Sequence, residues 1–269
     1  MKIFAGFMER INRKKLNEWI KRGLVKQDSY SALWIKSTDR KIFDRIKAMR
    51  FASTQDFWAQ ESSWSIKELF PELYKNQVDF IKKEFIPYLD NSKCVCDLAC
   101  ADGEWTFFIS PFVKQVDGIE YSDLMVSKAK QEAKSKSILN VSFSQGDART
   151  VVYSHPYDDF IMMGLLSYFN DDEDVELILN RIHDALKNNG RIMIKDSLIY
   201  DDIKEDGYYF YNIDSGYESY YRTKKKLFDM FSKAGFELEK ETVLREDERI
   251  GMRVGNIGAV FVKRDSYDS

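Results

Sequence analysis

The sequence predicts an α/β fold: a doubly wound, mostly parallel seven-stranded sheet with helices on both faces, plus an α-helical N-terminal extension. One observation and one general rule support this prediction. From residue 93 onward, short apolar runs typical of buried strands alternate with segments of helical periodicity. Strands that alternate with helices require right-handed crossovers, and therefore a mostly parallel sheet.

The strands are expected where apolar residues form short runs, and the helices where apolar residues recur every three or four positions. The expected strands are residues 93–99, 115–120, 141–145, 159–164, 190–196, 236–243 and 257–263. The expected helices between them are residues 104–112, 122–136, 172–187 and 223–234. The last of these ends at Gly235, a residue suited to the left-handed position that follows a helix. A further helix is expected after Pro71.

The N-terminal part of the chain differs in charge from the rest. Residues 1–53 contain fourteen Lys and Arg against five Asp and Glu, which gives a net charge of +9, whereas the other 216 residues carry −12. We therefore divide the chain into a basic, aromatic-rich extension or lid over residues 1–70 and a main domain over 71–269. Residues 3–24 read as an amphipathic helix that packs on the main domain or rests on an anionic membrane surface. Trp58 and Trp64 belong either to the lid or to an aromatic core.

Composition excludes several classes of protein. The net charge of −3 disfavours a nucleic-acid binder, although the basic extension leaves an RNA substrate open. No apolar run approaches the roughly 20 residues of a membrane-spanning helix, and charges at Glu9 and Arg10 interrupt any signal peptide. The cysteines, Cys94, Cys96 and Cys100, form no disulfide framework, so a cytoplasmic location is expected.

The loop after the first expected strand has the composition of a ligand-binding turn. Small residues at Ala99, Ala101 and Gly103 allow a tight turn and a close approach of backbone to ligand. A dinucleotide-binding loop would have a third small residue at position 104, where Glu104 would instead face a pyrophosphate. A nicotinamide cofactor is therefore disfavoured.

Two carboxylates follow at the ends of the next strands. Glu120 ends the second strand, where a carboxylate can accept hydrogen bonds from both hydroxyls of a ribose. Asp147 follows the third strand. In open α/β sheets, ligands bind beyond the carboxyl ends of the strands, so both carboxylates are expected beside one crevice.

Five segments in register with the expected strands carry a family resemblance over roughly residues 90–265. They are VCDLACADG, VDGIEYS, QGDA, YDDFIMMGLLSYF and LKNNGRIMIKD. In this order and spacing the chain resembles the class I S-adenosylmethionine (SAM)-dependent methyltransferases. The resemblance implies SAM as cofactor and S-adenosylhomocysteine as product. One departure is alanine at 99 and 101, where the family usually has glycine; an alanine with positive φ costs about 1 kcal/mol.

The resemblance also implies which residues hold SAM. The loop containing Asp97, Ala99, Cys100, Ala101 and Gly103 would hold the methionine part. The ribose and adenine would contact a second group: Glu120, Tyr121, Asp147, Ala148, Met163 and Gly164.

The candidates for a catalytic base stand at the strand exits. Asp196 ends the fifth strand and Tyr168 follows the fourth, although each would also suit a capping or packing role. His155 lies at the opposite end of the sheet, and His183 is on a crossover helix. No metal is expected, because Met163 and Gly164 occupy the fourth strand's exit, where a metal-binding carboxylate would be needed.

A tyrosine-rich segment at about 198–222 is expected to insert on the substrate side. Residues 200–222 contain seven of the fifteen tyrosines, and amphipathic rings of this kind suit a binding wall. A plain hairpin with tyrosine faces would look the same. Tyr208, Tyr221 and Arg222 are the candidate substrate contacts, and Arg222 would pair with an anionic group or cap the next helix.

The expected reaction is in-line transfer of a methyl group to an oxygen of a small molecule or glycan, which is anionic if it carries a phosphate. Two alternatives stay open. Ile194-Lys195-Asp196-Ser197 is somewhat similar to a motif of protein N-terminal methyltransferases, whose usual Lys-Asp-Asn is Lys-Asp-Ser here. The other alternative is a cofactor-binding partner without transferase activity.

Overall fold

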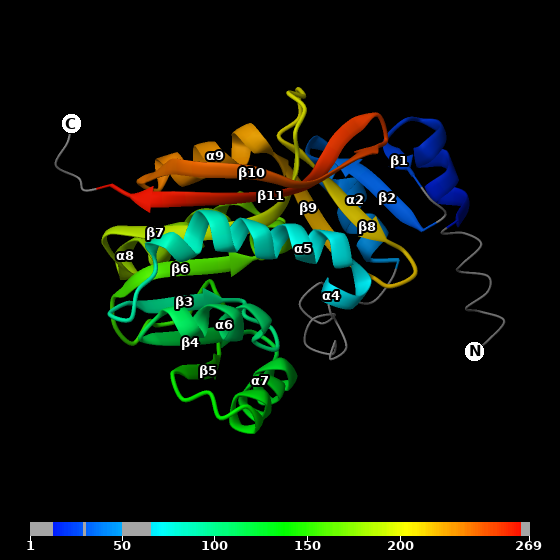
Figure 1. Cartoon of the computed structure of the whole chain (residues 1–269). Coiled ribbons are helices and arrows are strands. Elements are labelled where there is room, and N and C mark those ends of the chain that lie inside the picture. The colour runs from blue at the N-terminus through cyan, green and yellow to red at the C-terminus, as the bar shows by residue number, and fades with distance from the viewer. Residues whose placement is uncertain (1–12, 29–30, 50–65, 265–269) are drawn as a thin grey trace.

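The computed structural model describes residues 13–28, 31–49 and 66–264 and confirms the α/β fold (Figure 1). All seven expected strands are present: β3 (Cys94–Leu98), β4 (Gln115–Glu120), β5 (Val141–Gln145), β6 (Tyr157–Met163), β7 (Leu186–Ile199), β10 (Phe236–Arg249) and β11 (Met252–Lys263). They form one continuous path in the order β5-β4-β3-β6-β7-β11-β10. The first five strands are parallel, whereas β11 is antiparallel to both β7 and β10.

The sheet is larger than the seven strands expected, because four more strands bring the described sheet to eleven. These are β1 (Val25–Gln27), β2 (Ala32–Lys36), β8 (Gly207–Asn212) and β9 (Glu218–Thr223). β9 pairs with the last two residues of β7, β8 pairs with β9, and β2 pairs with β8. The end of β7 therefore has β11 and β9 beside it, and the sheet divides there.

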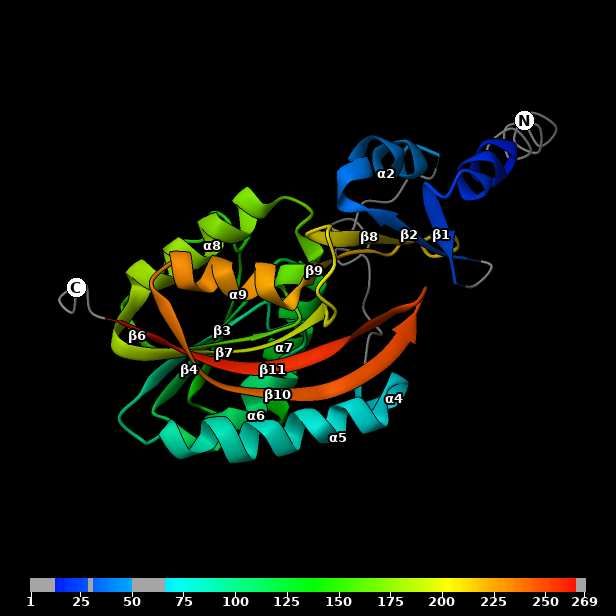
Figure 2. The ribbon, with the colours of Figure 1, turned by 90° about the horizontal axis from the view of Figure 1, so that it is seen from above.

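Helices cover both faces of the sheet, as expected (Figure 2). α8 (Asp172–Ala185) and α9 (Lys224–Lys233) bury their apolar side chains on one face. On the other face lie α5 (Pro71–Phe80), which continues as a π-helical turn over Ile81–Phe85, and α6 (Glu104–Ile109). α7 (Asp123–Ser135) packs on Phe143 of β5. The short elements are α4 (Ile66–Leu69) and the 3-10 turns Ser37–Asp39, Ile86–Tyr88, Ser110–Phe112 and Leu166–Tyr168.

The N-terminal extension is not purely helical, which corrects that part of the prediction. Residues 13–21 are helical and α2 covers Arg40–Lys47, but β1 and β2 lie between them and extend the sheet. Pairing of β2 with β8 explains the strands: Leu33, Ile35 and Phe43 are buried against Tyr209 and Tyr211 of β8. Residues 3–12 of the expected helix, with Trp58 and Trp64, lie outside the described residues.

Two consequences follow for the site. The switch in strand order falls between β3 and β6, so ligands are expected beyond the carboxyl ends of those strands. The extension and the tyrosine-rich segment share one sheet, at the end where β7 meets β9. Among the described residues, no helix is long and apolar enough to span a membrane.

Candidate functional site

The backbone of the loop after β3 is strained at the two alanines that replace the family's usual glycines. Ala99 and Ala101 have φ of 64° and 49°, and Gly103 has φ of 88°. The Ile119 carbonyl of β4 accepts from the amides of Ala99 and Cys100, at 2.7 and 3.2 Å. These bonds hold the turn against β4 in spite of the unfavourable alanine conformations.

Glu120, at the end of β4, reaches back to this loop. Its carboxylate accepts from the Ala101 amide at 3.0 Å and from the Ser122 amide at 2.8 Å. Burial raises the pKa of Glu120, and these backbone hydrogen bonds oppose the rise. These hydrogen bonds fix the position of the Glu120 carboxylate relative to the loop. Its oxygens still have lone pairs that can accept from further donors.

Asp97, at the end of β3, is a buried carboxyl group beside the loop. One oxygen accepts from the Thr106 hydroxyl at 2.6 Å, and the other has no hydrogen-bond partner among the described residues. Burial raises its pKa to about 7. A buried carboxyl group with an unpartnered oxygen is costly unless a ligand supplies a donor, which makes Asp97 a candidate binding residue.

A first cavity lies over these strand ends. Its wall contains eight of the residues predicted to bind cofactor: Ala99, Ala101, Glu120, Tyr121, Asp147, Ala148, Met163 and Gly164. The other three predicted residues lie next to it. Asp97 is beneath the loop, Cys100 packs with Phe143 and α7, and Gly103 begins α6. Arg149 donates to both oxygens of Asp147 and lowers its pKa.

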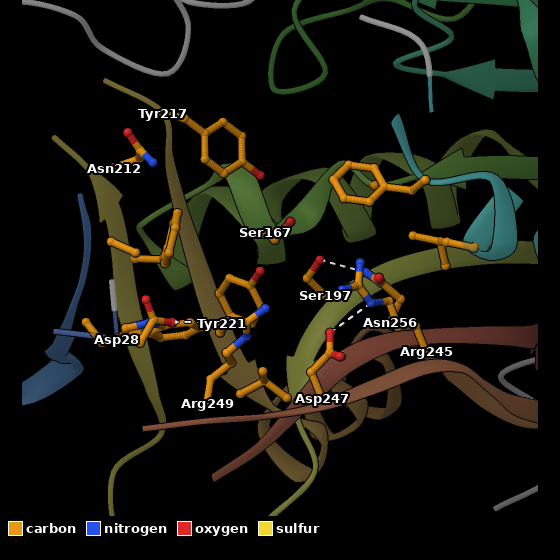
Figure 3. A pocket seen from close by; sticks show the side chains of 18 of the residues that line it. Asp28, Ser167, Ser197, Asn212, Tyr217, Tyr221, Arg245, Asp247, Arg249 and Asn256 are labelled. Atoms are coloured by element: carbon orange, nitrogen blue, oxygen red, sulfur yellow. Dashed lines mark hydrogen bonds and ion pairs between the residues drawn. The ribbon is translucent and has the colours of Figure 1, made fainter. Parts of the chain in front are cut away.

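A second cavity, of about 500 Å³, is lined in part by the extension. Figure 3 shows Asp28 of the extension among the lining side chains. Its aromatic wall contains Trp34 of β2, Phe210 of β8 and Tyr221 of β9, with Trp34 and Tyr221 centroids 4.9 Å apart. The opposite side is polar: Ser197 accepts from the Asn256 side chain at 2.8 Å, and Arg245 pairs with Asp247 at 2.8 Å.

The two cavities share three residues: Gly164, Tyr168 and Lys195. Gly164 has φ of 95°, and a Cβ there would lie 3.2 Å from the Lys195 amine. The Tyr217 hydroxyl donates to the Tyr168 hydroxyl at 3.4 Å, and burial raises the pKa of Tyr168. The boundary between the cavities is therefore narrow and carries one amine and one phenol.

Among the residues predicted to act in catalysis or to contact the substrate, three line neither cavity, and their contacts are structural. Asp196 is buried and accepts from the amides of Leu166, Ser167 and Ser197, so its oxygens position the turn before Tyr168. Arg222 is fully buried, as described next. Tyr208 packs with Trp34 in an apolar cluster.

Arg222 fastens β9 to the chain that follows the Leu166–Tyr168 turn. Its guanidinium donates to the Asp172 carboxylate at 2.8 Å and to the carbonyls of Leu166 and Phe169 at 3.1 and 2.9 Å. These donors are used within the protein, so the geometry does not favour Arg222 as a contact for an anionic substrate.

Sequence reasoning missed Lys195, Trp34 and Arg245. Lys195 was visible as a lysine that interrupts the apolar run Ile192-Met193-Ile194 at the exit of a buried strand. Trp34 and Arg245 gave no local signal, because they reach the cavity only through pairing of β2 with β8 and of β10 with β11.

Comparison with known proteins agrees with this geometry. Residues 89–235 match the family described as Methyltransferase domain. The chain belongs to this family and has the fold of a class I SAM-dependent methyltransferase.

Two curated bacterial relatives match parts of the chain. A demethylmenaquinone methyltransferase of Lactococcus lactis is 29% identical over 102 residues, which are 37% of this chain and 40% of the relative. An uncharacterized methyltransferase of Bacillus subtilis is 25% identical over 131 residues, 46% of this chain and 51% of the relative. The chain thus spans about half or less of the length of these relatives.

Solved structures show the same fold. An S-adenosylmethionine-dependent methyltransferase from Clostridium acetobutylicum superimposes with a TM-score of 0.59 at 16% identity, covering 74% of this chain and 96% of that one. The N-methyltransferase NodS of Bradyrhizobium japonicum, solved with S-adenosyl-L-homocysteine, gives 0.59 at 11% identity, covering 79% and 98%. SAM is the cofactor of this class, and the loop, Glu120 and the unpartnered Asp97 oxygen fit its polar groups.

Proposed function

We propose that the protein methylates an oxygen of a small molecule or glycan that binds in the second cavity. The observation that carries this proposal is the shared boundary of the two cavities at Gly164, Tyr168 and Lys195. When bound, SAM supplies a methyl group already activated by the positive charge on sulfur. Holding an acceptor oxygen in line with that methyl group supplies much of the rate enhancement.

The residues of the first cavity act by holding the cofactor. Glu120 would accept from the ribose hydroxyls, and Asp97 would use its unpartnered oxygen for the methionine part. Asp147 would accept from the adenine amino group, with Tyr121 and Ala148 beside the ring. Met163 and Gly164 form the floor, where the absence of a side chain at 164 keeps the passage open.

The second cavity favours a small polar molecule with a flat or ring-shaped face. A volume of about 500 Å³ lies within the usual range for small-molecule sites. The rings of Trp34, Phe210 and Tyr221 offer stacking surfaces for an aromatic ring or the apolar face of a sugar. Asn256 and Ser197 offer partners for hydroxyl groups. Burial keeps Tyr168 protonated, so its hydroxyl orients the acceptor as a donor rather than removing a proton.

The test is to incubate the protein with methyl-labelled SAM and a fractionated extract of its host. We expect base-stable label in the small-molecule or glycan fraction, and no label when Gly164→Leu blocks the boundary. Label in protein would overturn the proposal in favour of an N-terminal methyltransferase. SAM binding with no label in any fraction would favour a non-catalytic binding partner. Because the three cysteines are free, we place this activity in a reducing cytoplasm.

A further inference from the structure

We propose that Lys195 acts as a neutral amine and removes the proton from the acceptor oxygen during methyl transfer. This inference rests on the proposed function and concerns the same boundary. Lys195 belongs to the wall of both cavities, whereas Asp196, the carboxylate expected in this role, belongs to neither.

The first step of the argument is the position of the amine. Lys195 lies near the end of β7, between Met163 of β6 and Gly258 of β11. Its amine lies 3.2 Å from where a side chain on Gly164 would begin, so the glycine leaves it room at the passage. A methyl group that crosses from the first cavity to the second must pass beside this amine.

The second step is the lack of a counter-ion. In the second cavity, Arg245 pairs with Asp247 at 2.8 Å, and Arg249 approaches Asp28 at 4.0 Å. Within the part of the chain that the structure describes, Lys195 has no ion pair with any carboxylate. An ammonium group that is buried without a partner is expensive, so the neutral amine is favoured.

The third step concerns the charges around the amine. Asp196 is adjacent in sequence and favours the ammonium form, but its oxygens are occupied by three backbone amides. On the cofactor side the acidic groups are Glu120, Asp147, which Arg149 neutralises, and Asp97 beneath the loop, whose pKa burial raises to about 7. On the acceptor side the phenols Tyr168, Tyr217 and Tyr221 are neutral, because burial raises the pKa of each.

The balance of these effects lowers the pKa of Lys195, chiefly through burial, with the nearby Asp196 charge opposing the shift. The positive charge on the cofactor sulfur would lower it further. Cofactor binding and the neutral amine therefore favour each other by linkage.

The proton transfer balances as follows. The acceptor O–H bond breaks, and its proton goes to the Lys195 nitrogen, which changes from –NH₂ to –NH₃⁺. The acceptor oxygen forms the new bond to the methyl carbon, and the carbon–sulfur bond breaks with its electron pair left on sulfur. The ammonium then releases its proton to solvent after product leaves.

The first experiment uses binding alone, with SAM and S-adenosylhomocysteine as probes and the full chain as protein. We compare wild type, Lys195→Met and Lys195→Arg by calorimetry at pH 8 and pH 6. S-adenosylhomocysteine is neutral at sulfur, so its affinity reports whether each variant still folds a working first cavity.

We expect Lys195→Arg to lose at least tenfold in SAM affinity relative to S-adenosylhomocysteine, because a permanent cation repels the sulfonium. Lys195→Met should keep the wild-type ratio at pH 8. On acidification, wild type should move toward the Lys195→Arg ratio by more than Lys195→Met does, because any change in Lys195→Met reports other groups such as Asp97. A wild-type ratio in Lys195→Arg at pH 8 would overturn the proposal, since Lys195 would then be a cation already.

The second experiment measures turnover with the acceptor fraction found by labelling. Lys195→Met should lower kcat by at least a hundredfold with little change in SAM affinity, and should remove the acid limb of the pH–rate profile. Full turnover in Lys195→Arg would overturn the proposal, because it would make Lys195 an anchor for an anionic acceptor. Failure of the proposed function itself would look different: wild type would bind SAM with the expected pH dependence and label nothing.

Discussion

The two cavities are built in different ways. Most of the wall of the first comes from short segments that end adjacent parallel strands, within residues 98–101, 119–121, 146–148 and 163–165. The wall of the second comes from segments more distant in the chain, including β2, β8, β9 and the β10–β11 hairpin. The first cavity therefore depends on local loop geometry, and the second depends on how distant strands dock.

This difference predicts that a side chain outside both cavity walls can be important because it docks distant strands on one another. Arg222→Ala tests it, because Arg222 ties β9 to Asp172 and to the Leu166 and Phe169 carbonyls. We expect a loss of about 2–4 kcal/mol in unfolding free energy, measured by urea denaturation, because the Leu166 and Phe169 carbonyls lose their donor, whereas Asp172 keeps Lys226 at 3.0 Å. The exposed arginine in Arg253→Ala is the control and should change little. Equal stability of the two variants would contradict the role assigned to Arg222.

In the first cavity, the largest loss of SAM affinity is expected from a substitution of Glu120. Glu120→Gln keeps the shape but removes the charge that accepts from the Ala101 amide and that is proposed to accept from the ribose hydroxyls. We expect SAM affinity to fall about 10–100-fold by calorimetry, equivalent to about 1.4–2.8 kcal/mol. Glu132→Gln, on the solvent side of α7, should bind SAM as wild type does. Wild-type affinity in Glu120→Gln would remove Glu120 from the cofactor site.

Asp97 is expected to make the unfolding free energy of the protein depend on pH. Its pKa in the folded protein is about 7, above the ordinary 3.8, because it is buried. Between those values the unfolded chain releases a proton that the folded protein retains, so stability falls as pH rises from 4 to 7. Asp97→Asn removes this dependence. Its stability relative to wild type should increase by about 2 kcal/mol from pH 5 to pH 8, while SAM binding weakens.

The comparison of wild type with Asp97→Asn also controls for other groups that titrate in this pH range. Burial also raises the pKa of Asp159, to about 6. Asp159 is present in both wild type and Asp97→Asn, so its contribution cancels in the difference between their unfolding free energies. A difference in unfolding free energy that stays constant from pH 5 to pH 8 would show that Asp97 is ionised in the folded protein.

The smallest effect is expected in the loop itself. Ala101 has φ of 49°, which costs roughly 1–2 kcal/mol, whereas glycine adds about 0.4–1 kcal/mol of unfolded-chain entropy. Ala101→Gly should therefore stabilise the protein by about 0.5 kcal/mol in urea unfolding. Ala133→Gly, in helix α7, is the matched control and should destabilise it. Destabilisation by both substitutions would mean that the loop is not strained at 101.

The sequence alone predicts those parts of the molecule that are recognisable from patterns of neighbouring residues. Apolar runs of strand length predicted the parallel strands β3, β4, β6 and β7, because a parallel strand that is buried has few polar positions. The first cavity followed from them, since the strand ends place Ala99, Glu120 and Asp147 at one edge of the sheet. The positive φ of Ala99 and Ala101 also follows from the tight turn that the loop must make.

The tertiary structure decided the rest through pairings between residues far apart in sequence. Nothing near Trp34 shows that β2 pairs with β8, and the apolar pattern of residues 3–24 concealed that strands follow the helix. Asp196 and Lys195 are neighbours, yet alternation along β7 gives only Lys195 access to the cavities. Arg222 was predicted as a substrate contact, but in the structure it donates to Asp172 and to the carbonyls of Leu166 and Phe169. Local patterns determine which elements form, whereas side-chain direction and long-range pairing determine which residues meet.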